Sequence, residues 1–379
     1  MRLLVISHTP HHRGDDGRIA GWGATVRELD AIAGTVDQLV HLAPLHPGAP
    51  SAAMRPYSSE NVRFVAVAPA GGESMRAKLG IITAVPQWVR AMRREMASAD
   101  AVHVRLPANI SFIAVLLLVA RRRPARRWFK YAGTWDARRG VGWSYRMQRW
   151  GLRRLRPMHR GVVTIAGSAL NQPRHVVALL NPALSDAELG EGRASHDRVT
   201  DGSVRIVFAG RLEHAKGALV AVATARRLAE WGHSVHLDLA GDGPLRGEIE
   251  RDSAVADGLV TVHGWLDRHR LNALYADAHV VLLPSMTEGF PKVLAEGMAF
   301  GAVPVASDVG SIRAVFAEVG AGIVTDAADD HAFAQAIGDL MATPERWQDE
   351  SARARRAASA FTYDRYVRAV SQLLERAPP

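Results

Sequence analysis

The sequence predicts an α/β protein of two doubly wound halves, each a parallel sheet covered by helices, with a cleft between them. Strand-like and helix-like segments alternate along most of the chain, pause at a polar stretch, and then restart. A length of 379 residues suffices for two cores. We expect an N-terminal domain over 1–184, a linker over 185–202, a C-terminal domain over 203–361 and a final helix within 362–379.

Each expected element follows from its apolar pattern, since short apolar runs predict strands and apolar residues at helical spacing predict helices. The expected strands are 2–7, 38–44, 62–69, 100–107, 127–133, 161–167, 204–210, 234–241, 260–266, 279–285 and 302–308. The helices include 23–33, 82–97, 111–122, an arginine-rich helix before residue 161, 216–232 and 363–376. The stretch "SDAELGEGRASHDRVTDG" is polar, contains glycine and has no period, which is typical of a linker.

Composition excludes several classes of function. The chain has no cysteine, so it forms no disulfide, thiolate metal site or cysteine nucleophile. The longest apolar run, "SFIAVLLLVA", is shorter than the roughly 20 residues that span a bilayer. The apolar run at the start is too short for a signal peptide. We therefore expect a cytoplasmic protein.

The net charge of +9 is concentrated in one region. Residues 121–160 contain 14 basic residues and one acidic residue, whereas the remainder has 33 basic and 37 acidic residues. Large apolar side chains alternate with arginines in 138–160, as in a helix that lies on an anionic membrane surface. The alternative is a solvated arginine-rich surface. No nucleic-acid motif accompanies the basic region, so nucleic acid is not an expected partner.

A first candidate site lies in "FAGRLEHAKG", where a strand reaches Gly210 and a loop carries Arg211 and Lys216 before a helix begins. Ligands of open α/β sheets bind at this carboxyl edge. Two cations beside a helix N-terminus suit a diphosphate. The glycine and hydroxyl residue that a P-loop requires are not in place. Two exposed loop cations without a ligand remain the alternative.

A second candidate site lies in "SMTEGFPKVLAEGMAF". Glu288 falls in the loop after a strand, Pro291 suits the first turn of a helix, and Glu296 follows about two turns in. The amides at the start of this helix would be available to an anion, and the loop carboxylate could accept bonds from sugar hydroxyls. The alternative is a helix with one acid favoured by the dipole and another on a solvated face.

Both motifs, in this order and with "AGDGP" and "VHGWL" between them, resemble the retaining glycosyltransferases of family four (glycosyl transferases group 1), which have the GT-B fold. The resemblance is strong over 204–310 and weaker in the N-terminal half. It implies two Rossmann-like domains facing across a cleft, and a C-terminal helix that crosses back to the first domain.

The resemblance also implies roles for residues. Arg211 and Lys216 would neutralise the donor diphosphate, Glu288 would contact the transferred sugar, and Glu296 would bind the nucleotide ribose. The other donor-binding residues that it implies are Gly21, Gly23, Gly210, Gly264, Trp265, Leu266, Gly289, Phe290, Pro291, Lys292, Val293 and Leu294.

The N-terminal half departs from the family pattern. Gly21 and Gly23 stand where the family has paired glycines, but Val26 rules out a dinucleotide fingerprint. His103 follows an Asp-apolar-apolar pattern and is a candidate catalytic residue, while Arg105 stands where the more catalytic histidine is expected. Strand alternation places both on one face, and a structural role for His103 is an open alternative.

The predicted function is transfer of a sugar from a nucleotide-diphosphate donor to a hydroxyl acceptor with retention of configuration. The acceptor would be a glycan, a lipid-linked glycan or a small metabolite, with Arg105, Trp135 and Asp136 as candidate contacts. No Asp-x-Asp metal motif is present, so we expect neither a metal nor another cofactor. The alternatives are a GT-B nucleotide-sugar epimerase, which needs more carboxylates in the first domain, and a non-catalytic nucleotide-sugar-binding protein.

Overall fold

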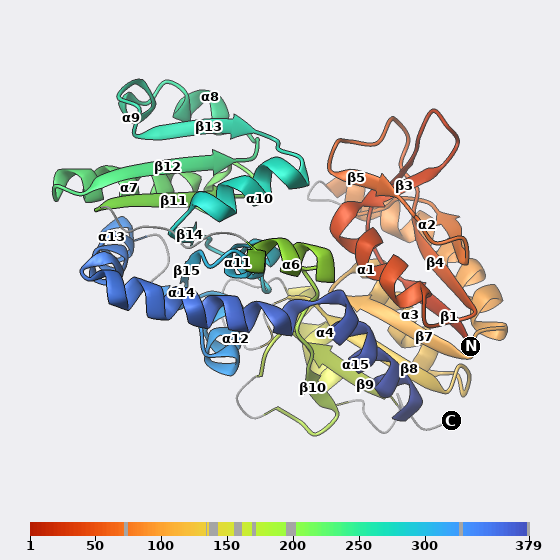
Figure 1. Ribbon diagram of the computed structural model, residues 1–379. Helices are drawn as coiled ribbons and strands as arrows, with labels where there is room; N and C mark the ends of the chain where they lie inside the picture. The colour runs from red at the N-terminus through yellow and green to blue at the C-terminus, as the bar shows by residue number, and fades with distance from the viewer. Residues whose placement is uncertain are drawn as a thin grey trace. The chain divides into compact units, whose positions relative to one another are not determined.

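The computed structural model contains two compact units (Figure 1). It describes residues 1–71, 75–133, 135, 143–154, 161–168, 172–194, 202–325 and 329–376. Unit 1 comprises Met1–Ile165, Leu170–Leu179 and Tyr366–Pro379. Unit 2 comprises Ala166–Ala169 and Leu180–Arg365. Each unit has its own parallel sheet flanked by helices, which confirms the predicted fold class.

The sheet of unit 1 has the order β10-β9-β8-β7-β1-β4-β6, and all its pairs are parallel. Its strands are β1 (Arg2–Ile6), β4 (Gln38–Pro44), β6 (Val62–Val67), β7 (Ala101–Leu106), β8 (Arg126–Tyr131), β9 (Gly161–Ile165) and β10 (Val176–Ala178). The chain winds outward from β1 through β4 to β6, then returns to β7 and winds the other way. The winding therefore reverses between β1 and β7, and ligands of such sheets bind beside this reversal.

The helices of unit 1 are α1 (Gly23–Ala33), α2 (Met75–Ala97), α3 (Asn109–Val119), α4 (Trp143–Arg154) and most of α15 (Tyr363–Arg376). Tyr366, Val370 and Leu374 are spaced four apart on α15 and are buried with Leu3 and Trp128. The apolar stripe of the last helix thus completes the core of unit 1.

A small antiparallel sheet also belongs to unit 1 and was not predicted. Its order is β2-β3-β5, formed by β2 (His11–Arg13), β3 (Ile19–Trp22) and β5 (Met54–Pro56). Gly21 lies in β3 against the ring of His11, where an added Cβ would stand 2.3 Å from Nε2. At Gly23, the first residue of α1, an added Cβ would stand 3.0 Å from the carbonyl oxygen of Ala53. Close packing within unit 1 therefore explains why glycine stands at both positions.

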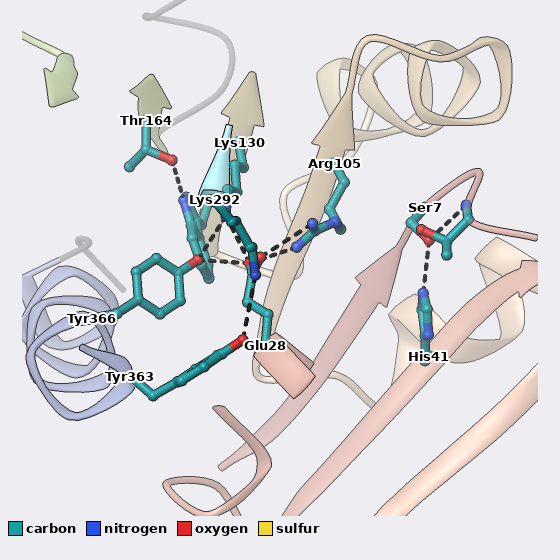
Figure 2. Close-up of polar contacts among 11 residues, drawn as sticks. Ser7, Glu28, His41, Arg105, Lys130, Thr164, Lys292, Tyr363 and Tyr366 are labelled. Carbon is teal, nitrogen blue, oxygen red and sulfur yellow. Dashed lines mark hydrogen bonds and ion pairs between the residues drawn. The ribbon is translucent and has the colours of Figure 1, made fainter. Parts of the chain in front are cut away.

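A buried carboxylate joins four elements of unit 1. Glu28 of α1 is 3% exposed and accepts hydrogen bonds from Arg105 of β7 at 2.6 and 3.3 Å. Lys130 of β8 donates to the same carboxylate at 2.7 Å, and the hydroxyl of Tyr366 donates at 2.8 Å. Figure 2 shows the four side chains converging. This cluster, which we call the Glu28 cluster, holds α15 to the sheet by polar contacts as well as apolar ones.

Buried histidines form a second polar group in unit 1. His41 Nε2 lies 2.8 Å from Ser7 Oγ, and its Nδ1 lies 2.5 Å from the hydroxyl of Tyr57. His11 Nε2 lies 2.8 Å from the same hydroxyl, and its Nδ1 lies 2.8 Å from the carbonyl oxygen of Thr9. Burial lowers the pKa of His11 to about 4 and holds the pKa of His41 well below its usual range.

We expect the free energy of unfolding to fall as the pH decreases from 7 to 5. Unfolded histidine takes up a proton near pH 6.5, whereas folded His11 does so only near pH 4. The unfolded chain therefore binds more protons between these values, and acid favours unfolding. His11 alone should contribute on the order of 2 kcal/mol to this loss. Urea unfolding at several pH values measures it. His11→Gln should flatten the pH dependence, while replacement of the exposed His269 by Gln should not; equal slopes would contradict the assignment.

The sheet of unit 2 has the order β13-β12-β11-β14-β15-β16 and is parallel throughout. Its strands are β11 (Ser203–Ala209), β12 (Ser234–Ala240), β13 (Val260–Gly264), β14 (Val280–Leu283), β15 (Val303–Ser307) and β16 (Ile323–Thr325). Its helices are α6 (Asp186–Ala194), η1 (His214–Lys216), α7 (Ala218–Glu230), α8 (Arg246–Ile249), α9 (Ser253–Ala256), α10 (Arg268–Asp277), α11 (Lys292–Ala299), α12 (Ile312–Val319), α13 (Asp330–Met341), α14 (Pro344–Ala358) and η2 (Ser359–Phe361). The winding reverses between β11 and β14.

The first half of the expected linker is instead a helix of unit 2, α6. Ser185 and Glu188 form a capping box, because Ser185 Oγ accepts from the Glu188 amide while the Glu188 carboxylate accepts from the Ser185 amide at 2.7 Å. Gly192 packs so closely that a Cβ would stand 2.2 Å from the Ala299 carbonyl oxygen. The polar composition is that of a helix with one exposed face. Residues 195–201 lie outside the described residues.

Candidate functional site

The carboxyl ends of β11 and β14 bring the two sequence motifs together, because these strands are neighbours at the reversal of winding. Gly217 has a φ of +72°, and a Cβ there would stand 2.0 Å from the Pro284 carbonyl oxygen. The amide of Met286 donates to the Ala215 carbonyl oxygen at 2.9 Å. The loop after β11 therefore packs directly on the loop after β14, and only glycine fits at the point of contact.

Lys216 and Glu288 form an ion pair across these loops. Lys216 Nζ donates to Glu288 Oε1 at 2.6 Å, and the two side chains are 32% and 10% exposed. Arg211 lies on the exposed part of its loop, with Nε 3.2 Å from a carboxylate oxygen of Glu213. The structure thus joins one predicted phosphate-binding cation to the predicted sugar-binding carboxylate. Among the described residues, no group of three or more His, Asp or Glu side chains could hold a metal ion.

The loop that carries Glu288 is held by its neighbours. Gly310 has a φ of +64°, and a Cβ there would stand 2.1 Å from the Glu288 carbonyl oxygen. The Gly289 carbonyl oxygen accepts from the amide and the hydroxyl of Ser311 at 3.0 and 2.9 Å. Phe290 is buried, with its ring stacked on Phe361 at 5.1 Å. Its side chain therefore anchors the loop, and only its backbone could contact a ligand.

The start of α11 differs in detail from the prediction. Pro291 is the N-cap residue, and Lys292 is the first residue of the helix, followed by Val293. The amide of Leu294 donates to the Pro291 carbonyl oxygen at 3.3 Å, so it is already used within the helix. Lys292 Nζ lies 3.4 Å from the hydroxyl of Tyr363 and 5.5 Å from the centre of its ring.

Glu296 is 5% exposed, which excludes the alternative of a solvated helix face. Arg268 Nη2 donates to its Oε1 at 3.0 Å, and the hydroxyl of Tyr275 donates to its Oε2 at 3.3 Å. Burial and the neighbouring carboxylate raise the pKa of Tyr275 well above its usual value. Burial opposes the charge of Arg268, but Glu296 and Glu188 outweigh it and raise the pKa of the guanidinium. The Glu296 carboxylate is therefore held on both oxygens.

Three glycines line the same edge of the sheet at the ends of β11, β12 and β13. Gly241 has a φ of +148°, and a Cβ there would stand 1.8 Å from the Gly210 carbonyl oxygen. Its amide donates to the Gly264 carbonyl oxygen at 2.8 Å. Next to Gly264, Trp265 is 55% exposed, and Leu266 packs on the core of unit 2. The segment Gly264–Leu266, predicted to bind the donor, therefore lies on the edge that carries Gly210.

Three residues that were predicted to act in the first domain are buried or already hydrogen-bonded within unit 1. His103 is fully buried and stacks on Trp128 with ring centres 3.6 Å apart, so a substrate cannot reach it. These surroundings favour the structural role that the sequence left open for His103. The guanidinium of Arg105 donates both of its hydrogen bonds described above to Glu28, within the Glu28 cluster. Trp135 is 6% exposed and packs on Tyr131, so its side chain is not available to an acceptor. Asp136 lies outside the described residues.

Sequence reasoning missed a cavity of about 440 Å³ in unit 1. It lies at the carboxyl ends of β1, β4, β6 and β7, beside the reversal of winding. The lining residues are His8, Pro10, Pro44, His46, Pro69, Ala70, Gly71, Trp88, Pro107, Ala108, Asn109, Ile110 and Tyr145. Proline, alanine and aromatic walls surround a few neutral polar groups, and none of these residues is a carboxylate. The residues come from six separate segments, so no single stretch of sequence reveals them.

One face of α4 is basic and aromatic. Arg146, Trp150, Arg153 and Arg154 are exposed and recur at helical spacing; we call them the α4 face. Arg149, by contrast, is buried and donates to the Trp135 carbonyl oxygen at 2.9 Å, so it does not belong to the predicted basic surface. Residues 136–142 and 155–160 of the basic region lie outside the described residues. No helix among the described residues has the length and apolar character needed to cross a membrane.

Comparisons with known proteins find relatives of the part of the chain that carries both motifs. Residues 203–343 match the family model for glycosyl transferases group 1. D-inositol 3-phosphate glycosyltransferase of Xylanimonas cellulosilytica is 35% identical over 176 residues, which are 45% of this chain and 42% of that protein. A GDP-mannose-dependent alpha-(1-6)-phosphatidylinositol dimannoside mannosyltransferase of Mycobacterium tuberculosis is 32% identical over 168 residues, 44% and 42% of the two chains. The chain thus spans less than half the length of these relatives.

Similarity to solved structures covers both units. Sucrose-phosphate synthase from Thermosynechococcus elongatus has a TM-score of 0.69 at 18% identity, over 99% of this chain and 98% of that chain. Anabaena HepE in complex with UDP has a TM-score of 0.67 at 14% identity, over 99% and 100%. Identities this low establish the fold alone. The chain has the GT-B fold, and its residues 203–343 match the family model for glycosyl transferases group 1.

Proposed function

We propose that the protein is a glycosyltransferase that moves a sugar from a nucleotide-diphosphate donor to a hydroxyl acceptor, with retention of configuration and without a metal. The observation that carries this proposal is the Lys216–Glu288 pair at the reversal of winding in unit 2, within the residues that match the family. The two relatives found by sequence are named as a glycosyltransferase and a mannosyltransferase, and the HepE structure contains UDP.

Different residues at this edge of the sheet bind different parts of the donor. Arg211 and Lys216 bind the diphosphate and stabilise the charge that develops on it as the leaving group departs. A diphosphate offers Lys216 more negative charge than one carboxylate does, so its arrival releases Glu288 to accept hydroxyl bonds from the sugar. Glu296 binds the ribose. The acceptor attacks from the same face as the departing diphosphate, through an oxocarbenium-like state, and Glu288 is not a covalent nucleophile.

The acceptor binds in the cavity of unit 1. Its apolar walls suit the flat faces of a ring, and its imidazole, amide and phenol groups suit hydroxyls. The absence of carboxylates from the lining residues favours a neutral or anionic acceptor over a cationic one. Two of the relatives are named for an inositol phosphate and for a phosphatidylinositol glycoside. A phosphorylated or lipid-linked polyol therefore fits the proposal best.

The test is mass spectrometry of products formed from UDP-, GDP- and ADP-sugars with inositol phosphate, sugar phosphates and phosphatidylinositol vesicles. NMR of the product gives the anomeric configuration, and a parallel reaction with EDTA tests the metal. Inversion of the anomeric configuration contradicts the retaining mechanism. A loss of activity in EDTA that only Mg²⁺ or Mn²⁺ restores contradicts metal independence. An epimerised donor sugar identifies an epimerase. Tight donor binding without turnover on any acceptor identifies a binding protein.

We further propose that the α4 face lies on an anionic membrane. Tyr145 of α4 lines the cavity, and the α4 face begins at the next residue, so a lipid-linked acceptor could extend from one to the other. Each arginine near an anionic surface contributes about 1 kcal/mol, and salt screens this term. Changing Arg146, Arg153 and Arg154 to Glu should therefore reduce binding to anionic vesicles at least about tenfold in a flotation assay.

A matched control reverses the same number of charges elsewhere. Arg251, Arg270 and Arg356 are exposed arginines of unit 2, and changing them to Glu should leave flotation nearly unchanged. Vesicles of neutral lipid should bind none of the three proteins, that is, the wild type, the α4-face variant and the control variant. Wild-type protein that ignores anionic vesicles at low salt would rule out the membrane and leave a water-soluble acceptor.

A further inference from the structure

Arg268 connects two helices of unit 2 at the candidate site. It is the first residue of α10, and the preceding Asp267 caps the helix by accepting from the Arg270 amide at 2.9 Å. Nη2 of Arg268 donates to Glu296 Oε1 at 3.0 Å, while its Nε lies 3.3 Å from Glu188 Oε1. The planar guanidinium therefore contacts a carboxylate on α11 through Nη2 and a carboxylate on α6 through Nε.

The α6 end of this connection is itself held. Glu188 Oε2 accepts from the Ser185 amide at 2.7 Å and from the Ser185 hydroxyl at 2.9 Å. The capping box thus uses one carboxylate oxygen, and Arg268 uses the other. A glutamate held in this way gives Arg268 a defined orientation. The helix that sequence analysis took for a linker is thereby part of the support of the candidate donor site.

The effect on Glu296 follows from the bonding capacity of a carboxylate. Each oxygen can accept two hydrogen bonds, and Arg268 and Tyr275 supply one to each oxygen. One acceptor position on each oxygen remains, which matches the two adjacent hydroxyls of a ribose. The terminal torsion of a glutamate is otherwise broad, so a carboxylate without these two donors would not keep both positions directed at one diol.

We propose that Arg268 is a positioning residue for Glu296, and that the Glu188–Arg268–Glu296 bridge makes the site select ribonucleotides over 2′-deoxyribonucleotides. The proposal rests on the proposed function, in which Glu296 binds the donor ribose. Arg268 contacts the nucleotide only through Glu296. A merely structural Arg268 would weaken the binding of ribo- and deoxyribonucleotides by the same factor, whereas a positioning Arg268 changes the ratio of the two affinities.

The test is calorimetry with UDP, GDP, dUDP and dGDP on the folded full chain. The wild type should bind either UDP or GDP at least roughly tenfold more tightly than the matching deoxynucleotide. The reason is that a site which hydrogen-bonds a hydroxyl disfavours the analogue without it. In Arg268→Gln the affinity for the ribonucleotide should fall about tenfold and the affinity for the deoxynucleotide less than about threefold. The ratio of the two affinities should therefore approach one. Arg268→Lys, which keeps the charge but not the planar fork, should give an intermediate ratio.

Two further variants keep the test decisive if Arg268→Gln does not fold. Tyr275→Phe removes one hydroxyl and should lower the ratio about two- to threefold. Arg227→Gln breaks a half-buried ion pair with Asp330 in the same unit and should leave the ratio unchanged. Ratios that stay at the wild-type value in folded Arg268→Lys and Tyr275→Phe overturn the proposal.

The failure of the proposed function gives a different result. A wild type that binds none of the four nucleotides overturns the donor site itself, and this inference with it. A Glu296→Gln variant with an undiminished ratio shows that Glu296 is not the ribose ligand, whatever Arg268 does.

Discussion

Replacing Lys216 with alanine is expected to lower kcat/KM by about two to three orders of magnitude, or about 3–4 kcal/mol of transition-state stabilisation. The substitution removes a cation from the segment after β11, which in the proposed reaction faces the charge that develops on the leaving diphosphate. It also leaves the carboxylate of Glu288, which is 10% exposed, without its bond to Nζ. Arg211→Ala should cost about 2–4 kcal/mol for the same electrostatic reason.

The measurement is steady-state kinetics with the donor and acceptor that the product screen identifies. Arg226→Ala is the control, because Arg226 is an exposed cation of unit 2 paired with Asp252, and its loss should leave turnover nearly unchanged. Near-normal kcat/KM in folded Lys216→Ala and Arg211→Ala would remove both residues from the reaction.

Glu28→Gln is expected to destabilise unit 1 by about 3–5 kcal/mol. The substitution leaves the buried cations of Arg105 and Lys130 without the carboxylate that both contact. Breaking a buried ion pair on one side is costly because the remaining charge has lost its solvent and its partner. Chemical unfolding followed by tryptophan fluorescence should report the loss, since Trp88 and Trp128 are both buried in unit 1.

Tyr366→Phe provides the comparison for this prediction. It removes one hydroxyl from the Glu28 cluster and no charge, so it should cost only about 1 kcal/mol. If Glu28→Gln costs no more than Tyr366→Phe, the cluster contributes as ordinary hydrogen bonds and not as a charge balance.

Much of the fold could be predicted because buried parallel strands appear in sequence as short, nearly continuous apolar runs. The two motifs were also visible, since each occupies one loop at the end of one strand. The bond between Lys216 and Glu288, however, joins positions 72 apart, and only the pairing of β11 with β14 brings them together. Sequence order carries no direct signal of such a contact.

Other features escaped prediction for specific physical reasons. The strands of the small antiparallel sheet have three or four residues, too few to show alternation. The capping box of α6 was present as Ser185 and Glu188, but the polar composition around it concealed the helix. The pattern around His103 made it a candidate for catalysis and left a structural role open, because the pattern does not show that the ring stacks on Trp128.

The place of α15 also has a consequence for synthesis on the ribosome. Unit 2 is formed largely by one continuous segment, Leu180–Arg365, whereas unit 1 needs Tyr366 against Glu28, which was made 338 residues earlier. Domains usually mature in the order in which they emerge. Here the first unit to emerge must wait for the last helix, so its nascent core stays open, with the Glu28 carboxylate lacking one of its donors, until unit 2 has left the exit tunnel. We therefore expect the N-terminal unit to be the later of the two to mature.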